Sequence, residues 1–193
     1  MWSVLDRLIK QNTENVNLLK TKDYNIFSVL QIQSKEVLIC RMIADLLNPR
    51  GQHGAGAEYL KIFLRDCLGM EKMDTKLADQ AIVTAEYAID DERRIDIVIE
   101  IGSYFLPIEV KIYAADQKSQ CFDYYQYAKR RDAQAKVYYL TLDGHRPGKD
   151  STSSGSQSVP EEDIVCLSFR VHILNWLKAC KSCENTGMVP ILE

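Results

Sequence analysis

The chain has 193 residues, of which 46% are apolar, and a formal net charge of −3 at pH 7. This length and apolar content suffice for one well-buried core, so we expect a single domain over residues 1–193. The negative charge excludes a global basic field that would attract nucleic acid, so any such contact must depend on local patches such as Arg93-Arg94 or residues 129–131.

Hydropathy and cysteine usage narrow the class of protein further. No apolar run reaches the roughly 18 residues of a membrane span, and the N-terminus lacks a basic start followed by an apolar signal core. We therefore expect a cytoplasmic protein that does not enter a membrane. The six cysteines are not spaced like a disulfide framework, and the CxxC of Cys180 and Cys183 lacks the second ligand pair of a zinc site. Free thiols are therefore the favoured interpretation.

The first 70 residues predict three helices. Residues 1–20 form an amphipathic pattern with Leu5, Leu8 and Ile9 on one stripe. A second helix is predicted from Ser34, with apolar residues at i, i+3, i+4, i+7 and i+8, and it should end at Asn48-Pro49. A glycine-rich loop follows, and then a third helix. Its inward residues should be Tyr59, Leu60, Phe63, Leu64 and Cys67.

After residue 80 the pattern becomes extended. Strands are predicted at 81–89, 94–101 and 105–113, and Asp116 then stands where the N-cap of a helix over 117–131 belongs. A strand at 136–142 precedes a Ser-, Gly- and Pro-rich stretch, about 144–162, that predicts a mobile surface loop. A short strand at 164–167 and a helix at 171–181 complete the order of predicted elements.

The second and third strands carry a set of charges on one face. In the second strand the alternating isoleucines, Ile95, Ile97, Ile99 and Ile101, should share one face. In the third strand Glu109 and Lys111 lie opposite the apolar face. If Gly102-Ser103 is a two-residue hairpin loop, Ile101 pairs with Tyr104, and Asp96 then lies directly across from Glu109.

Two opposed carboxylates are destabilising unless a positive charge lies between them. Hard cations such as Mg²⁺ bind one or two carboxylates and complete their shell with water and phosphate oxygens. Lys111 could then orient or help deprotonate the attacking water, which makes a site for metal-assisted phosphodiester hydrolysis. The alternative is an ordinary hairpin whose polar face is solvated.

Other residues extend this candidate site. Glu36 falls on the apolar stripe of its helix, where a charge needs a partner or a metal, although a helix-start glutamate favoured by the dipole is the alternative. Gln117, Gln120 and Tyr124 form one polar helix face that could reach a phosphate or its water, or could simply be solvated. His53, in the glycine-rich loop, is a candidate substrate contact, although a lone loop histidine is usually only a surface residue. Motifs of the GxxxxGK, HExxH and GxSxG types are absent from the sequence.

The order of elements and these residues resemble the PD-(D/E)XK nuclease superfamily. In that superfamily an acidic residue lies on the first core helix, an Asp on the second strand and (D/E)xK on the third, which correspond here to Glu36, Asp96 and 109–111. The stretches DLLNPRGQHG, RIDI, IEVKI and DQKSQCFDYY resemble more narrowly a poorly characterised, mainly prokaryotic branch, in which Glu86 also has a counterpart. The resemblance spans roughly residues 30–142.

The resemblance implies an α/β fold with a restriction-endonuclease-like core, in which helices flank a mixed sheet made of a three-stranded meander and further strands. It also implies a Mg²⁺-dependent nuclease that acts on DNA, with Mn²⁺ as a substitute ion and a homodimer as a candidate assembly. Two departures stand out. Ile95 replaces the eponymous proline before the aspartate, and Val110 stands where the branch often has Asn, so Val110 would offer the metal only its carbonyl.

The residues then take specific expected roles. Metal ligands would be Asp96, Glu109, the Val110 carbonyl and Glu36, the last either as a direct ligand or by contacting one. Lys111 would position the attacking water. Contacts to the scissile phosphate would come from Gln117, Gln120, Tyr124 and His53. Rival interpretations are a non-catalytic module that binds nucleic acid or protein on the same scaffold, and a structural subunit of a larger complex.

Overall fold

The structure is a computed structural model that describes residues 35–183 apart from residue 72, all within one compact unit, Ser34–Glu193. The helix predicted over residues 1–20, with Leu5, Leu8 and Ile9, lies outside the described residues. The expectation of a single domain over 1–193 concerns the whole chain and stays a prediction.

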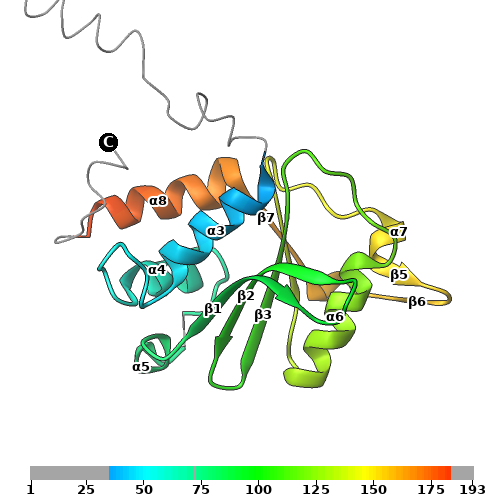
Figure 1. Cartoon of the computed structure of the whole chain (residues 1–193), viewed down its shortest axis with the longest axis horizontal. Coiled ribbons are helices and arrows are strands. Elements are labelled where there is room, and N and C mark those ends of the chain that lie inside the picture. The colour runs from blue at the N-terminus through cyan, green and yellow to red at the C-terminus, as the bar shows by residue number, and fades with distance from the viewer. Residues whose placement is uncertain (1–34, 72, 184–193) are drawn as a thin grey trace, which may run out of the picture. The chain divides into compact units, whose positions relative to one another are not determined.

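A mixed five-stranded sheet with the order β1-β2-β3-β4-β7 forms the centre of this unit (Figure 1). Its strands are β1 (Ile82–Ala88), β2 (Arg94–Ile101), β3 (Tyr104–Lys111), β4 (Val137–Thr141) and β7 (Ile164–Ser168). The first three strands form an antiparallel meander, whereas β3, β4 and β7 run parallel to one another. The predicted mixed sheet is therefore confirmed, with its meander at one edge.

Helices flank this sheet, and they include helices at each position predicted between residue 34 and residue 181 as well as short ones that were not predicted. In the described residues they are α3 (Glu36–Leu47), α4 (Glu58–Asp66), α5 (Thr75–Ala78), α6 (Gln120–Arg131), α7 (Lys149–Thr152) and α8 (Leu174–Lys181), together with the 3-10 helix η2 (Glu161–Asp163) and the π-helix η3 (Phe169–Ile173). Helix α3 ends at Leu47, and Asn48 takes an extended ψ of 121°, as a residue before proline prefers.

The helices form layers on the two faces of the sheet (Figure 1). Helices α3, α4 and α8 pack over the main core, which contains Ile97, Ile99 and Ile108 from β2 and β3. The indole Nε1 of Trp176 donates a hydrogen bond of 2.8 Å to the Tyr59 carbonyl and so ties α8 to α4. Helix α6 covers the opposite face, so the sheet lies between two helical layers.

The hairpin of β2 and β3 has the predicted register. Ile101 pairs with Tyr104 across a turn in which Gly102 takes a φ of 58°, as the first residue of a type II′ turn requires. Pairing continues as far as Ile97 with Ile108, so Asp96 and Glu109 are the next two residues along the hairpin.

The prediction that Ile95 shares a face with the other isoleucines of β2 is wrong. Ile95 packs beside Tyr124 under α6, on the other face from Ile97. The reason is a local break in the sheet: Glu86 of β1, which would pair with Asp96, has a left-handed φ of 54° and is missing from an otherwise continuous register.

Three local predictions need correction: the end of one strand, the start of one helix and the role of Asp116. In two of them a carboxylate accepts hydrogen bonds from backbone amides. The strand predicted at 105–113 ends at Lys111, since the next amides turn to Glu36. The helix predicted from Gln117 begins at Gln120, and Ser119, with a φ of 56°, occupies the N-cap position. Asp116 is not a cap: its carboxylate accepts hydrogen bonds from the Tyr139 hydroxyl (2.6 Å) and from a backbone amide at residue 148 (2.7 Å).

The segment predicted as a loop over 144–162 contains regular structure. It forms α7, the short hairpin of β5 (Ser153–Ser154) and β6 (Gln157–Ser158), and the start of η2. Ser151 and Val159 are buried, and they attach the segment to the rest of the domain.

Two observations concern the predictions made from hydropathy and from cysteine usage. No helix of the described residues combines the length and the apolar character needed to cross a membrane. Each of the six cysteines is a free thiol.

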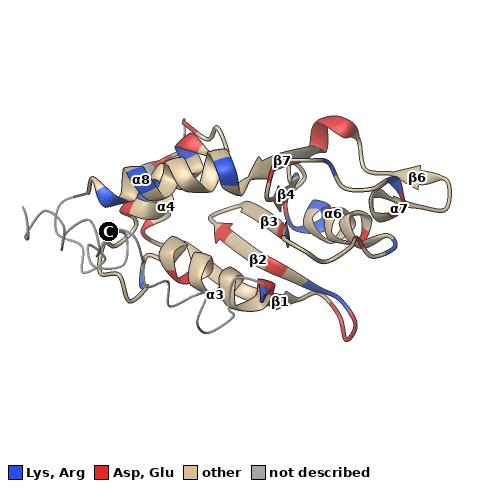
Figure 2. Cartoon of the chain, turned by 90° about the horizontal axis from the view of Figure 1, so that it is seen from above, with Lys and Arg blue, Asp and Glu red and all other residues tan. Residues whose placement is uncertain are grey.

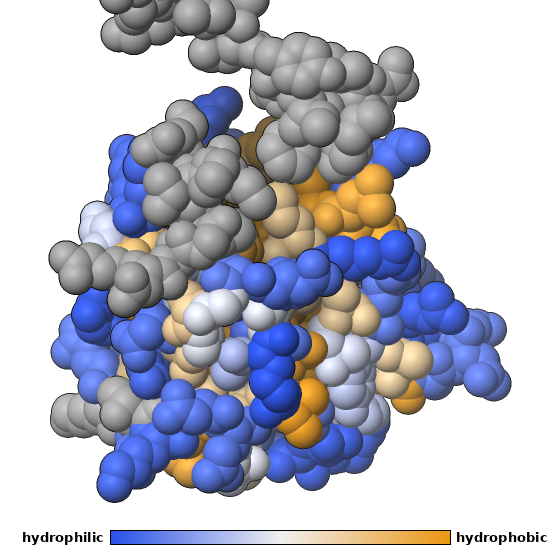
Figure 3. All heavy atoms as spheres, turned by 60° about the vertical axis from the view of Figure 1, so that its left-hand side comes forward, coloured by the Kyte–Doolittle hydropathy of each residue, from blue (hydrophilic) through white to orange (hydrophobic). Residues whose placement is uncertain are grey.

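The described residues on the face shown in Figure 3 are largely hydrophilic, with smaller apolar areas between them. One apolar groove lies between α3 and the segment from η3 to α8, where Met42 and Leu174 are among its exposed lining residues.

Candidate functional site

A polar pocket of about 370 Å³ opens where β2, β3 and the segment before α6 meet the start of α3. Its charged lining residues are the carboxylates Glu36, Asp91, Glu92, Asp96 and Glu109 and the cations Arg93, Arg94 and Lys111. Figure 2 shows the acidic β1–β2 turn in red directly beside the basic start of β2 in blue. With five carboxylates against three cations, the lining carries an excess of negative charge.

Asp96 and Glu109 lie at the point where the ladder of β2 and β3 ends. The Val110 amide donates a hydrogen bond of 2.8 Å to Oδ2 of Asp96, so a side chain takes the position of the next backbone partner. Glu109 is only 1% exposed. The Lys111 ammonium forms an ion pair with Oε1 of Glu109 at 2.6 Å, but no donor of the described residues is aligned for a hydrogen bond to either Glu109 oxygen.

Burial sets the protonation behaviour of this group. Burial first, and then the charge of Asp96, raises the pKa of Glu109 well above its usual value. Burial also raises the pKa of Asp96, against the Val110 amide that favours its charged form. For Lys111, burial acts to lower the pKa, but the carboxylates of Glu109, Asp96 and Glu36 together outweigh it, so the pKa is raised and the ammonium stays charged at neutral pH.

The residues present fit a divalent cation. Glu109 is a buried carboxylate that Lys111 alone offsets among the described residues, and the Asp96 charge beside it adds repulsion that a cation would relieve. The described residues hold no group of three or more His, Cys, Asp or Glu side chains arranged for a metal. Two carboxylates are nevertheless enough for Mg²⁺, which takes water and phosphate oxygens as its other ligands.

Glu36 reaches the rim of this pocket but uses one oxygen elsewhere. Its Oε1 accepts hydrogen bonds from three consecutive amides, those of Ile112 (2.6 Å), Tyr113 (2.8 Å) and Ala114 (3.0 Å). Burial acts to raise the pKa of Glu36, but these three amides outweigh it and the pKa is lowered. Glu36 therefore anchors the segment that follows β3.

The predicted polar face splits into an inner and an outer part. Gln120 is 5% exposed; its Nε2 donates to the Tyr124 hydroxyl at 3.1 Å, which donates in turn to the Arg94 carbonyl at 2.5 Å. Gln117, in contrast, is exposed at the pocket, and its Oε1 accepts a hydrogen bond of 2.9 Å from Arg93. Gln120 and Tyr124 are therefore supporting residues, and of the three only Gln117 has a side-chain end without a partner among the described residues.

His53 is not part of this pocket, and its place as a substrate contact needs correction. The ring is 3% exposed and stacks on Tyr59 with the centroids 4.7 Å apart. Nε2 lies 3.0 Å from the Asn48 carbonyl, and Nδ1 accepts a hydrogen bond of 3.1 Å from Ala55. Both ring nitrogens are engaged in holding the loop, so neither is available to a substrate.

Sequence reasoning missed the role of Arg93. The sequence marks it only as half of a basic pair, but its guanidinium contacts the loop before α6. It also left Glu86 without a role. The Glu86 carboxylate forms an ion pair with Arg41 of α3 at 2.5 Å, beside the break in the sheet. The three acidic residues before Arg93 were the signal in the sequence that could have indicated its role, because an acidic turn next to a site needs cations close by.

Comparison with known proteins gives one match. The family model described as the PD-(D/E)XK nuclease superfamily matches residues 24–188, which is more than half of the chain and extends beyond the motifs of residues 30–142. No curated protein and no solved structure matches the chain.

Proposed function

Because the chain belongs to the PD-(D/E)XK nuclease superfamily, we propose that it hydrolyses phosphodiester bonds in DNA with Mg²⁺, for which Mn²⁺ would substitute. The observation that carries this proposal is the buried Glu109 carboxylate, which lies beside the Asp96 carboxylate and has the Lys111 ammonium, 2.6 Å away, as its one counter-charge among the described residues. A purely structural hairpin gains little from this arrangement, since burying two carboxylates beside a single ammonium is costly.

Each residue takes a defined part in the proposed reaction. Asp96 and Glu109 would hold the cation, with the Val110 carbonyl as a further ligand and Glu36 in support through residues 112–114. When bound, Mg²⁺ would supply Lewis-acid activation of the phosphoryl group and of the attacking water.

The other polar groups act on the phosphate and the water directly. Lys111 stays protonated, so it acts as a cationic donor that orients the water and offsets charge that develops on the phosphate, and not as a base. Gln117 would donate from its amide to a phosphate oxygen. Gln120 and Tyr124 hold the floor of the pocket in place through the Arg94 carbonyl.

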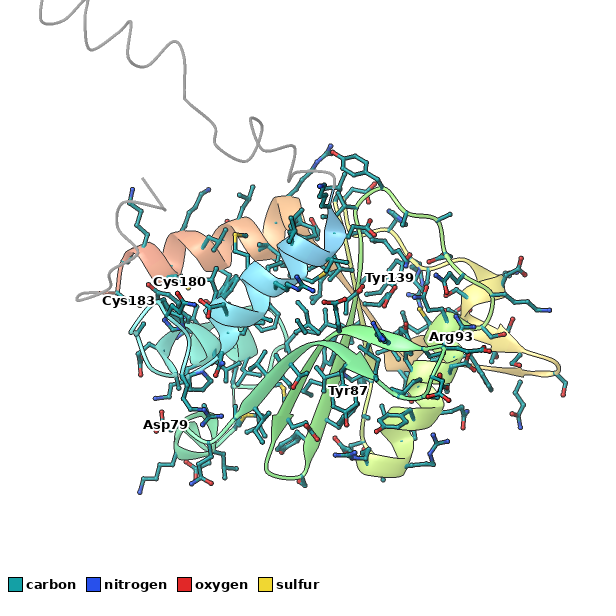
Figure 4. The ribbon with its side chains drawn as sticks, in the orientation of Figure 1. Asp79, Tyr87, Arg93, Tyr139, Cys180 and Cys183 are labelled. Atoms are coloured by element: carbon teal, nitrogen blue, oxygen red, sulfur yellow. The ribbon has the colours of Figure 1, made fainter. Side chains whose placement is uncertain are left out.

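Cleavage of supercoiled plasmid and of labelled duplex and single-stranded oligonucleotides tests the proposal. We expect cleavage in Mg²⁺ or Mn²⁺ but not in EDTA, and its loss in Asp96→Asn protein. The matched control is Asp79→Asn, because Asp79 lies at α5, far from Arg93 and the pocket (Figure 4). Equal activity in the Asp96→Asn and wild-type preparations would identify a contaminant and refute the assignment.

The second candidate is a non-catalytic module that binds nucleic acid or protein. Two observations favour it: the pocket lining is acidic overall, and one oxygen of Glu36 is already taken by backbone amides. Calorimetric titration with Mg²⁺ and Mn²⁺ separates the two candidates. Absence of binding at millimolar ion would favour the binding module, whereas binding that Asp96→Asn removes would favour the nuclease.

A homodimer belongs to the same proposal, because two copies would bring two sites to the two strands of a duplex. Light scattering after size-exclusion chromatography, with and without duplex DNA, measures the assembly directly. A monomer in both conditions would restrict the activity to one strand at a time.

A further inference from the structure

Arg93 is held in place by the turn that precedes β2. The Asp90 carboxylate accepts hydrogen bonds from the amides of Glu92 (2.9 Å) and Arg93 (2.7 Å), and the Arg93 carbonyl accepts one from Ile89 at 3.0 Å. The backbone of Arg93 therefore has a fixed position before its side chain makes any contact.

The Arg93 side chain spans from this turn to the segment that leads into α6 (Figure 4). Nη1 donates to Oε1 of Gln117 at 2.9 Å, Nη2 donates to the Lys118 carbonyl at 2.7 Å, and Nε lies 3.2 Å from Oδ2 of Asp123. The side chain is only 22% exposed. One guanidinium thus joins a loop residue, a loop carbonyl and the first turns of α6.

This contact determines which end of the Gln117 amide is free. A guanidinium has only donors, so the Gln117 atom that faces Arg93 must be the oxygen. The amide nitrogen is then the free end, and the described residues give it no hydrogen-bond partner. Because Gln117 lines the same pocket as Asp96 and Glu109, the pocket gains a donor and loses an acceptor at this position.

We propose that Arg93 is a positioning residue that orients Gln117 so that its amide nitrogen donates to a phosphate oxygen of the substrate. This inference rests on the proposed nuclease function and adds to it a residue that acts through another. The adjoining backbone supports it, because Arg93 also binds the carbonyl just before Ser119, whose left-handed φ of 56° sets the direction of the chain into α6.

A double-mutant cycle in single-turnover DNA cleavage tests the proposal. Arg93→Ala and Gln117→Ala should each slow cleavage by roughly 10- to 100-fold, the usual loss when a group that holds a functional residue is removed. If Arg93 acts through Gln117, the double variant should be no slower than Gln117→Ala alone. Losses that multiply would show that Arg93 contacts the substrate itself or acts by folding, and would overturn the proposal.

Two further variants separate positioning from charge and stability. Arg93→Lys keeps the charge but cannot reach all three partners, so it should recover only part of the rate. Arg65→Ala is the matched control, because Arg65 is an exposed arginine whose ion pair among the described residues is with its neighbour Asp66. Mn²⁺ affinity should not fall in Arg93→Ala protein, since Asp96 and Glu109 are untouched and one positive charge has left the pocket lining.

A readout that needs no activity keeps this inference distinct from the proposed function. The NMR signal of the Gln117 side-chain amide can be assigned by its loss in Gln117→Ala protein. Relaxation of this signal should show restricted motion in wild-type protein and increased motion in Arg93→Ala. Wild-type protein that cleaves nothing would refute the nuclease proposal, while this signal would still decide whether Arg93 orients Gln117. An equally ordered amide in both proteins would overturn the positioning role.

Discussion

The Lys111 ammonium lies 2.6 Å from Oε1 of Glu109, and both side chains are buried at the end of the β2–β3 ladder. Lys111 offsets the charge of one carboxylate, but Asp96 adds a second charge to the same space. The group therefore carries an excess of negative charge in a place with little water. A divalent cation removes that excess, which is why charge and not shape is the main argument for the site.

Replacing Lys111 by methionine separates its catalytic role from metal binding. We expect Lys111→Met to slow DNA cleavage by about 10²- to 10³-fold, the usual loss when one preorganised donor is removed. Mn²⁺ should bind at least as tightly as in wild-type protein, because a competing positive charge has been removed from the carboxylates. Cleavage rates and calorimetric titration measure the two effects.

Lys178→Met is the matched control for this substitution, since Lys178 is exposed on α8 and does not line the pocket. Weaker Mn²⁺ binding by Lys111→Met than by the control would contradict the assigned role.

Stability without metal should depend on pH through Glu109. A raised folded-state pKa means that the folded protein binds more protons than the unfolded chain, so the free energy of unfolding falls as pH rises from about 4.5 to the folded pKa. The fall is about 1.4 kcal/mol for each pH unit between the two pKa values. Asp96 contributes with the same sign, because its pKa is also raised.

Urea unfolding in EDTA between pH 5 and pH 8 measures this dependence, and Glu109→Gln should reduce it. The lowered pKa of Glu36 acts below this range, since its contribution is lost only as pH falls. Adding Mg²⁺ should restore stability mainly at the high end of the range. The same pH dependence in wild-type and Glu109→Gln proteins would show that Glu109 is not the titrating group.

The sequence predicts the fold and the central pair of carboxylates well, because both depend on local rules. Hydrophobic periodicity determines the strands, and a two-residue turn at Gly102 determines the register that brings Asp96 next to Glu109. The Glu36 contacts were not predictable, since they join amides more than 70 residues away in the chain. The contacts of Arg93 were not predictable either, because they depend on how the turn before β2 meets α6.

Substitutions of Glu36 distinguish an anchor from a metal ligand. Glu36→Gln retains an oxygen for the amides of residues 112–114, so it should keep most of the stability and the Mn²⁺ affinity. Glu36→Ala leaves three amides without their acceptor, and it should lower the free energy of unfolding by about 1–3 kcal/mol. Urea unfolding and calorimetry measure both. A large loss of Mn²⁺ affinity in Glu36→Gln would instead identify Glu36 as a direct ligand.

His53→Ala tests whether that residue is structural. The substitution removes two hydrogen bonds and a buried ring that stacks on Tyr59, so we expect the free energy of unfolding to fall by about 2–4 kcal/mol. Below the melting temperature the folded variant should cleave DNA at the wild-type rate. His145→Ala is the matched control, because His145 is an exposed histidine whose contacts are an exposed pair with Asp143 and a loose edge contact with the Tyr139 ring, so the substitution should leave stability nearly unchanged. Slower cleavage by His53→Ala at unchanged stability would return His53 to the substrate site.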